Sequence, residues 1–263
     1  MVTKAKGESS LAQGRPAHIL SARNISKRFG GVAALEDASI EVYPREIVAV
    51  VGDNGAGKST LISCITGALS PDSGSINLDG TEVTSASPGE IRNLGVETVY
   101  QGLALPPDIS CAASIFLGRE IRRPGLLGAL GFVDWPGMRT RARDKLKEFG
   151  IDMPKTSRLV STLSGGQRQS VAITRAVMWG SKMLVLDEPT AALGVVQTKA
   201  VLETVLAARD SGVGILLISH NVRDVMAVAN RIVVLRLGRV VASLNKSETT
   251  AQDVVAYITG AKG

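Results

Sequence analysis

The chain has 263 residues, of which 44% are apolar and only 3% aromatic. A core built mainly from Val, Ile, Leu and Ala favours an α/β fold in which helices cover parallel strands. The net charge of +6 is too small to indicate nucleic acid or an acidic membrane surface as a partner. No run approaches the roughly 18 apolar residues of a membrane span, and residues 1–17 form a polar tail that we expect to be mobile.

The first half of the chain begins with short β patterns. Residues 19–26, 38–42 and 47–51 are separated by Gly30-Gly31 and Pro44-Arg45, and residues 75–78 precede an Asp79-Gly80 turn. We expect these strands to form a small antiparallel sheet that carries the glycine-rich loop after residue 51. The two cysteines, Cys64 and Cys111, lack metal-ligand spacing and read as reduced thiols of a cytosolic protein.

The second half alternates between helical and buried-strand patterns. From about residue 103 to 179, Pro-Gly punctuation and helical periodicity, as in residues 138–149, predict an inserted helical subdomain. The remaining predictions are strands at 183–186, 214–218, 231–236 and 239–244 and helices at 195–209 and 221–229. We therefore expect one domain over residues 18–263, with polar residues after the strand ends where α/β sheets bind ligands.

Residues 52–60 match G-x-x-x-x-G-K-[ST] and lie between an apolar strand pattern and an amphipathic helix pattern. The glycines let backbone N–H groups surround a phosphate, and the helix start adds the positive end of its dipole. Lys58 supplies a charge for the β- and γ-phosphates, and Ser59 a hydroxyl for Mg²⁺. We predict that a nucleoside triphosphate is bound by Gly52, Asp53, Asn54, Gly55, Ala56, Gly57, Lys58, Ser59 and Thr60.

Two adjacent carboxylates, Asp187 and Glu188, follow an apolar run. Adjacent residues at a strand end point to different sides, so the two perform different tasks. Asp187 is suited to hold the hydration shell of Mg²⁺, and Glu188 to orient or deprotonate an attacking water. The alternative is a solvated acidic strand end, but a complete phosphate loop in the same chain favours a hydrolytic site.

The segment Leu163-Ser164-Gly165-Gly166-Gln167 precedes a helical pattern that places Ala172, Ala176 and Trp179 on one face. Taken alone, such a turn is a plain helix N-cap. Its Leu and Gln neighbours, and the carboxylate pair twenty residues later, favour a second anion site at a helix N-terminus.

These motifs together resemble the ATP-binding subunit of ABC transporters. Their order is that of the family: Walker A at 52–60, the Q-loop glutamine Gln101, the signature at 163–167, Walker B ending at Asp187-Glu188, and the switch histidine His220. The resemblance implies a P-loop NTPase (RecA-like) core with an antiparallel β subdomain and an inserted helical subdomain. It also implies a homodimer, because the Walker A of one subunit and the signature of the other enclose each ATP in this family.

The resemblance assigns roles to residues that say little alone. Gln101 would contact Mg²⁺ and water and link the site to the helical subdomain, and His220 would contact the γ-phosphate. Phe29 would stack on adenine, where the family more often has Tyr. After Walker B the family reads Ser-Ala-Leu-Asp, whereas residues 191–194 here are Ala-Ala-Leu-Gly. The missing aspartate puts its role across the dimer interface in doubt, but the retained Glu188 still implies hydrolysis.

Several details resemble the ribose, xylose and fructose importers: the Gly-Asp-Asn-Gly loop, Val99-Tyr100-Gln101, residues 115–120 and Ala-Ala-Leu-Gly. Many of these fuse two ATP-binding halves, and the single half here is most similar to fructose-type members. The resemblance implies ATP and Mg²⁺, an integral membrane permease, an indirectly coupled periplasmic sugar-binding protein, and a place on the cytoplasmic face of the bacterial inner membrane.

Two alternatives remain. An amino-acid importer would differ only in its partner. A soluble ABC-type ATPase acting on ribosomes or DNA would usually carry two cassettes or a long coiled-coil insertion, and its basic patches with interleaved aromatics are missing. We therefore expect no nucleic acid partner. The short basic cluster at residues 119–123 reads as a solvated face, and at best as a contact for a permease or lipid headgroups.

Overall fold

The structure is a computed structural model that describes residues 17–153 and 155–262. The predicted tail therefore lies, apart from Ala17, outside the described residues. The strands are β1 (Leu20–Phe29), β2 (Val32–Val42), β3 (Ile47–Val51), β4 (Ser73–Leu78), β5 (Thr81–Glu82), β6 (Val96–Val99), β7 (Met183–Asp187), β8 (Gly214–Ile218), β9 (Arg231–Arg236) and β10 (Arg239–Asn245).

Helices follow most of the strands. They are α1 (Lys58–Ile65), α2 (Pro88–Asn93), α3 (Cys111–Phe116), α4 (Leu126–Ala129), α5 (Trp135–Glu148), α6 (Gly165–Met178), α7 (Val195–Asp210), α8 (Val222–Val228) and α9 (Ala251–Thr259). Within the described ranges, none of them is long and apolar enough to cross a bilayer.

A six-stranded sheet forms the centre of the molecule. Its order is β10-β9-β3-β8-β7-β6, and all neighbouring pairs are parallel except β10 with β9. Every residue of β3 and of β8 is buried. Such continuous apolar runs are typical of parallel strands covered on both faces. The structure confirms the α/β class predicted from composition.

A second sheet is antiparallel, with the order β2-β1-β4-β5. The prediction that this sheet includes residues 47–51 and carries the glycine-rich loop is wrong, because those residues are β3 of the central sheet. The physical reason lies in the run itself. Five consecutive apolar residues cannot present one face to solvent, whereas the strands of a two-layer antiparallel sheet alternate.

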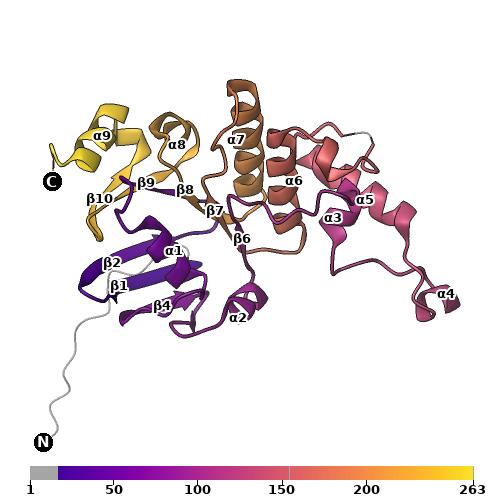
Figure 1. Cartoon of the computed structure of the whole chain (residues 1–263), viewed down its shortest axis with the longest axis horizontal. Helices are drawn as coiled ribbons and strands as arrows, with labels where there is room; N and C mark the ends of the chain where they lie inside the picture. Colours follow the sequence, from indigo (N-terminus) through magenta and orange to yellow (C-terminus); the bar gives the residue numbers. More distant parts are fainter. Residues whose placement is uncertain (1–16, 154, 263) are drawn as a thin grey trace, which may run out of the picture.

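The central sheet separates two layers. On one face, Val48, Val50 and Leu216 share an apolar core with α1 and the antiparallel sheet. On the other face, Leu186 and Leu217 pack against α6 and α7, while Ala49 and Val51 of β3 pack against α8 and α9. Figure 1 shows α9, α8, α7 and α6 side by side along the upper layer, with α1 and the antiparallel sheet below. Consequently α1 and α6 lie on opposite faces of the sheet.

The segment predicted as a helical subdomain has an apolar core of its own. Phe116 of α3, Met138 and Leu146 of α5 and Val171 of α6 belong to this core. The Phe116 ring meets Trp179 edge to face, with 5.3 Å between centroids. Other α6 residues, such as Ile173, pack on the central sheet instead. This separate core supports the subdomain, whose boundaries at about 103 and 179 remain a prediction.

Both cysteines are free and buried, which agrees with the predicted reduced thiols. Burial raises the pKa of Cys64 to about 11 and that of Cys111 to about 12. Neither thiol is therefore a nucleophile at neutral pH.

The separate core around Phe116 predicts a loss of stability when this ring is removed. Phe116→Ala should lower the free energy of unfolding by about 3–5 kcal/mol, because it removes a fully buried ring and leaves a cavity. Phe132→Ala is the matched control, since Phe132 is 55% exposed, and should change stability by no more than about 0.5 kcal/mol. Urea unfolding followed by circular dichroism measures both values. Equal losses in the two variants would contradict the separate core.

Candidate active site

Four motifs meet at one edge of the central sheet because their strands are parallel and in register. Val50 of β3, Ile218 of β8 and Asp187 of β7 form one row across the sheet. On the other side of β7, Val99 of β6 pairs with Leu186, the residue before Asp187. The loops that follow these strands therefore leave from the same edge, where parallel sheets bind ligands. They carry the glycine-rich loop, His220, Glu188 and Gln101.

The glycine-rich loop fits tightly between two β-hairpins. Gly52 has φ +153° and Gly57 has φ +107°. A Cβ at Gly57 would lie 2.6 Å from the carbonyl oxygen of Ala34, and one at Gly52 would overlap the carbonyl oxygen of Leu235. Only glycine fits at these two positions, for reasons of both space and conformation. The Gly238 N–H, in the β9–β10 turn, donates to the Ala56 carbonyl at 2.9 Å and holds the loop from the same side as Leu235.

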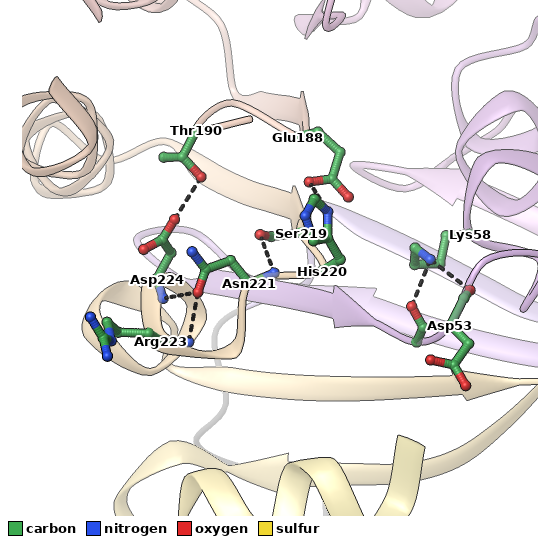
Figure 2. Close-up of polar contacts among 10 residues, drawn as sticks. Asp53, Lys58, Glu188, Thr190, Ser219, His220, Asn221, Arg223 and Asp224 are labelled. Carbon is green, nitrogen blue, oxygen red and sulfur yellow. Dashed lines mark hydrogen bonds and ion pairs between the residues drawn. The ribbon is translucent and has the colours of Figure 1, made fainter. Parts of the chain in front are cut away.

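The start of α1 presents donors at this loop. The Leu61 N–H donates to the Gly57 carbonyl at 2.9 Å, which closes the first helical turn and leaves the N–H groups of residues 58–60 directed out of the helix. Lys58 Nζ donates to the carbonyl oxygens of Gly52 at 2.7 Å and Asp53 at 2.9 Å (Figure 2). These carbonyls hold the ammonium group where phosphate oxygens can replace them as acceptors. The loop therefore fits a bound phosphate chain.

Glu188 takes an unusual backbone conformation immediately after β7. Its φ is +51°, in the left-handed region, and its N–H donates to the Ile218 carbonyl at 3.0 Å. The side chain is 18% exposed, and Oε2 lies 2.8 Å from Nδ1 of His220, which is 67% exposed. Figure 2 shows this pair together with Lys58 of the glycine-rich loop. Strained non-glycine residues gather at functional sites, and here the strain turns the carboxylate towards the histidine.

Asp187 and Glu188 are both half-buried. Burial raises the pKa of the Asp187 carboxyl above its ordinary value of 3.8, the neighbouring Glu188 raises it further, and Lys58 opposes both. A half-buried carboxylate whose pKa is raised by its surroundings is suited to a bound cation.

The donor set fits a magnesium ion held together with a nucleotide. Among the described residues, no group of three or more His, Cys, Asp or Glu side chains could hold a metal by itself. Ser59, Asp187 and Gln101 offer one hydroxyl, one carboxylate and one amide oxygen. Mg²⁺ is typically bound by one or two protein oxygens, substrate phosphates and water, so this small set matches its chemistry.

The sequence analysis did not identify the hydrogen bonds made by the residues that flank Glu188 and His220. Thr190, two residues after Glu188, donates from its hydroxyl to the buried Asp224 carboxylate of α8 at 2.7 Å. Asn221 caps α8 and receives the N–H of Arg223 at 3.0 Å, while the Ser219 hydroxyl oxygen accepts the Asn221 N–H at 3.1 Å (Figure 2). The Asn221 cap is a recognisable signal, but nothing local pairs Thr190 with Asp224.

Gln101 and Phe29 lie at the margins of the site. Gln101 is exposed and comes two residues after β6 ends. Leu103 and Ala104, which follow it, both have positive φ, so the chain bends sharply there. Phe29 is half-exposed at the tip of the β1–β2 hairpin, whose Ala34 carbonyl lies against Gly57. Both positions are compatible with their predicted roles, which remain predictions.

The signature segment does not reach the phosphate loop within one chain. Ser164 and Gln167 form a capping box at the start of α6, which packs on the opposite face of the sheet from α1. A Cβ at Gly166 would lie 2.9 Å from Cβ of Gln197 in α7, so this helix start is closely packed. Gly194 begins α7 without a side-chain cap. The start of α6 therefore lies away from the phosphate loop of its own chain, and its role as a second phosphate site remains a prediction.

Comparisons with known proteins point to one family. The ABC transporter family profile matches residues 35–191. The fructose import ATP-binding protein FrcA of Rhizobium meliloti is 50% identical over 93% of this chain and 95% of its own length. The xylose/arabinose import ATP-binding protein XylG of Sulfolobus acidocaldarius is 41% identical over 92% and 94%. A nucleotide-free ATP-binding cassette from an ABC transporter superposes with a TM-score of 0.76 at 27% identity, covering 91% of this chain and 96% of that one.

The raised pKa of Asp187 predicts a stability that depends on pH. Ionising this carboxyl costs more free energy in the folded protein than in the unfolded one. The folded state therefore loses stability as pH rises above the ordinary carboxyl pKa. We expect ligand-free Asp187→Asn to melt at a higher temperature than the parent at pH 7. The difference should vanish below about pH 3, where the carboxyl is protonated in both states.

Thermal unfolding at both pH values, with and without Mg²⁺ and ATP, measures this effect. Asp187→Asn should also lose most of the stabilisation that Mg²⁺ and ATP together give the parent. Asp108→Asn, at an exposed position, is the control and should change neither quantity. A lower melting temperature of Asp187→Asn at pH 7 would contradict the electrostatic argument.

Proposed function

This chain belongs to the ABC transporter family as an ATPase, and from this premise we propose that it hydrolyses ATP to power the import of a monosaccharide. The convergence of Lys58, Glu188 and His220 at one edge of the sheet carries the hydrolytic part of the proposal. The sugar part is supported by the relatives, whose names describe fructose and xylose or arabinose import. The chain is 50% identical to the fructose importer and 41% identical to the xylose/arabinose importer, so fructose is the first sugar to test.

We assign the proton acceptor to Glu188. Its carboxylate is mostly shielded, and the contact with His220 fixes its direction. A general base must lie within hydrogen-bond reach of the water that it deprotonates, which a fixed carboxylate beside a phosphate site can satisfy. His220, which is the more exposed of the pair, is free to turn its other nitrogen to the γ-phosphate. Phe29 would hold adenine, and residues 52–60 the phosphates.

Magnesium would be held by Ser59, Asp187 and Gln101, together with nucleotide oxygens and water. The ion supplies charge neutralisation for the phosphates during transfer. The protein's own contribution is the position of Lys58, which hydrogen bonds to the loop carbonyls hold at the start of α1.

The opposite placement of α1 and α6 supports a homodimer. One chain offers a phosphate loop and, across the sheet, a signature helix start that includes Ser164, Gly165, Gly166 and Gln167. Two copies related by a twofold axis would complete two identical sites, each with the loop of one copy and the signature of the other. Gly194 contributes no side chain to this interface.

We propose that the permease docks in a groove beside Gln101. This groove of about 330 Å³ is lined by Tyr100, Leu103, Arg119, Arg175 and Trp179, among others. Glu97 in its wall lies 3.5 Å from Arg119 and 3.7 Å from Arg92, and burial lowers the pKa of Arg175 below its ordinary value. The three arginines exceed the one carboxylate, so the groove suits a permease segment that brings an acidic side chain. The chain would then lie on the cytoplasmic face of the membrane, with a periplasmic binding protein as an indirect partner.

The first test concerns hydrolysis. Glu188→Gln should bind ATP normally, reduce turnover about 10²–10⁴-fold and accumulate as a dimer with ATP, because binding remains while the base is lost. Phosphate release, nucleotide titration and size-exclusion chromatography measure the three effects. Lys58→Ala is the contrasting variant and should weaken ATP binding itself. Unchanged turnover in Glu188→Gln would refute the role of this residue.

The second test concerns the transported solute. A strain lacking this gene should lose uptake of one labelled monosaccharide from a panel of fructose, xylose, ribose and several amino acids. The intact gene should restore uptake and the Glu188→Gln gene should not. Selective loss of amino-acid uptake would overturn the sugar proposal. Stimulation of ATPase activity by nucleic acid, with all uptake unchanged, would overturn import itself.

A further inference from the structure

The segment of residues 121–134, which we call the apolar loop, projects from the helical subdomain. Figure 1 shows it extending to the tip at α4, away from the rest of the described chain. Leu126 is 77% exposed and Leu130 is 66% exposed, and Leu127 and Phe132 are exposed beside them. Such a cluster of exposed apolar side chains marks an interaction surface in a soluble protein.

The apolar loop is folded by its own backbone hydrogen bonds. An antiparallel bridge between Arg122 and Val133 closes its base, where the Arg123 N–H donates to the Phe132 carbonyl at 2.9 Å. At the tip, the N–H groups of Leu130 and Phe132 donate to the carbonyls of Leu126 and Leu127 at 3.1 and 3.0 Å. These N–H groups need no water, so the tip can enter an apolar medium without losing them as donors.

The side chains indicate the medium. Residues 124–133 read Pro-Gly-Leu-Leu-Gly-Ala-Leu-Gly-Phe-Val and contain no side-chain nitrogen or oxygen. A protein partner normally exchanges about one hydrogen bond per 100–200 Å² of interface, which these side chains cannot supply. The hydrocarbon of a bilayer requires none. A lipid surface therefore fits the tip better than a protein surface does.

The charges at the base of the loop indicate which lipid headgroups it would contact. Arg122 and Arg123 are both exposed, whereas the one acidic residue of the loop, Asp134, is half-buried and accepts the Gly137 N–H at the start of α5. Arginines next to an apolar cluster can place their guanidinium groups among anionic headgroups while the apolar side chains enter the acyl region. Trp135, also exposed, comes directly after the loop, and Trp is enriched at this depth of a membrane.

We propose that the apolar loop is a membrane-interface element. It inserts Leu126, Leu127, Leu130 and Phe132 into the surface of a bilayer that contains anionic lipid, while Arg122 and Arg123 contact the headgroups. This contact requires neither nucleotide nor permease, so it stands independently of the proposed sugar import. It holds the helical subdomain at the membrane from a point outside the permease groove.

The test is flotation of the full chain with vesicles of phosphatidylcholine, with and without phosphatidylglycerol. The parent should bind the vesicles with phosphatidylglycerol. Leu126→Ser/Leu130→Ser should weaken this binding about tenfold or more, since it removes the inserted side chains. Arg122→Glu/Arg123→Glu should weaken it by at least about fivefold for each arginine. The control Arg45→Glu/Lys246→Glu makes the same charge change at exposed positions outside the loop and should bind nearly as the parent does.

A second measurement uses the fluorescence of Trp135, which follows the apolar loop. Lipids brominated in the acyl chain should quench the fluorescence of Trp135, and Trp135→Phe, which keeps Trp179, should lose this quenching. Failure of the parent to bind anionic vesicles, or equal binding by the parent and both loop variants, would overturn the proposal. Binding only to vesicles that contain the permease would assign the loop to a protein contact. Self-association in solution that Leu126→Ser/Leu130→Ser abolishes would assign it to a second copy, and either result also overturns the proposal.

Discussion

The in-register pairing of β3, β8, β7 and β6 is the constraint on which the site depends. Asp187 lies in one row with Ile218 and Val50, so the residues that follow these three strands emerge together. Because side chains alternate along a strand, a slip of one residue would turn Leu186 and Leu217 out of their core and carry Glu188 away from His220. The same buried apolar pattern that stabilises the sheet therefore also sets the geometry of the site.

The antiparallel elements hold the glycine-rich loop in place. In the β1–β2 hairpin, the Ala34 carbonyl lies against Gly57. In the β9–β10 hairpin, the Leu235 carbonyl lies against Gly52, and the Gly238 N–H donates to the Ala56 carbonyl. Backbone groups from an early and a late segment of the chain thus fix the conformation of the loop. This preorganisation lowers the cost of binding, since the donors are already in position when a phosphate arrives.

The helical insert has a different relation to the site. It has its own core around Phe116 and joins the sheet through α6 and through the bend after Gln101. A unit with its own core can move as a body on a few flexible connections. The groove beside Gln101 and the apolar loop lie on this unit, and we propose that both face partners at the membrane. Movement of the insert would then couple the nucleotide site to the transporter.

From local periodicity and from short motifs such as residues 52–60, the sequence predicted the α/β class, most strands and helices, and side chains that the structure brings to one edge of the central sheet. It placed β3 in the wrong sheet, since strand pairing is non-local and both sheets contain short apolar strands. It also could not find the bond between Thr190 and Asp224, or the apolar surface of the loop at Leu126 and Leu130. Those features depend on which segments pack together and which remain uncovered, and only the tertiary structure decides this. The separation of α1 from α6 by the sheet is of the same kind, because the glycine-rich loop and the signature segment are each recognised locally, whereas packing alone puts their helices on opposite faces.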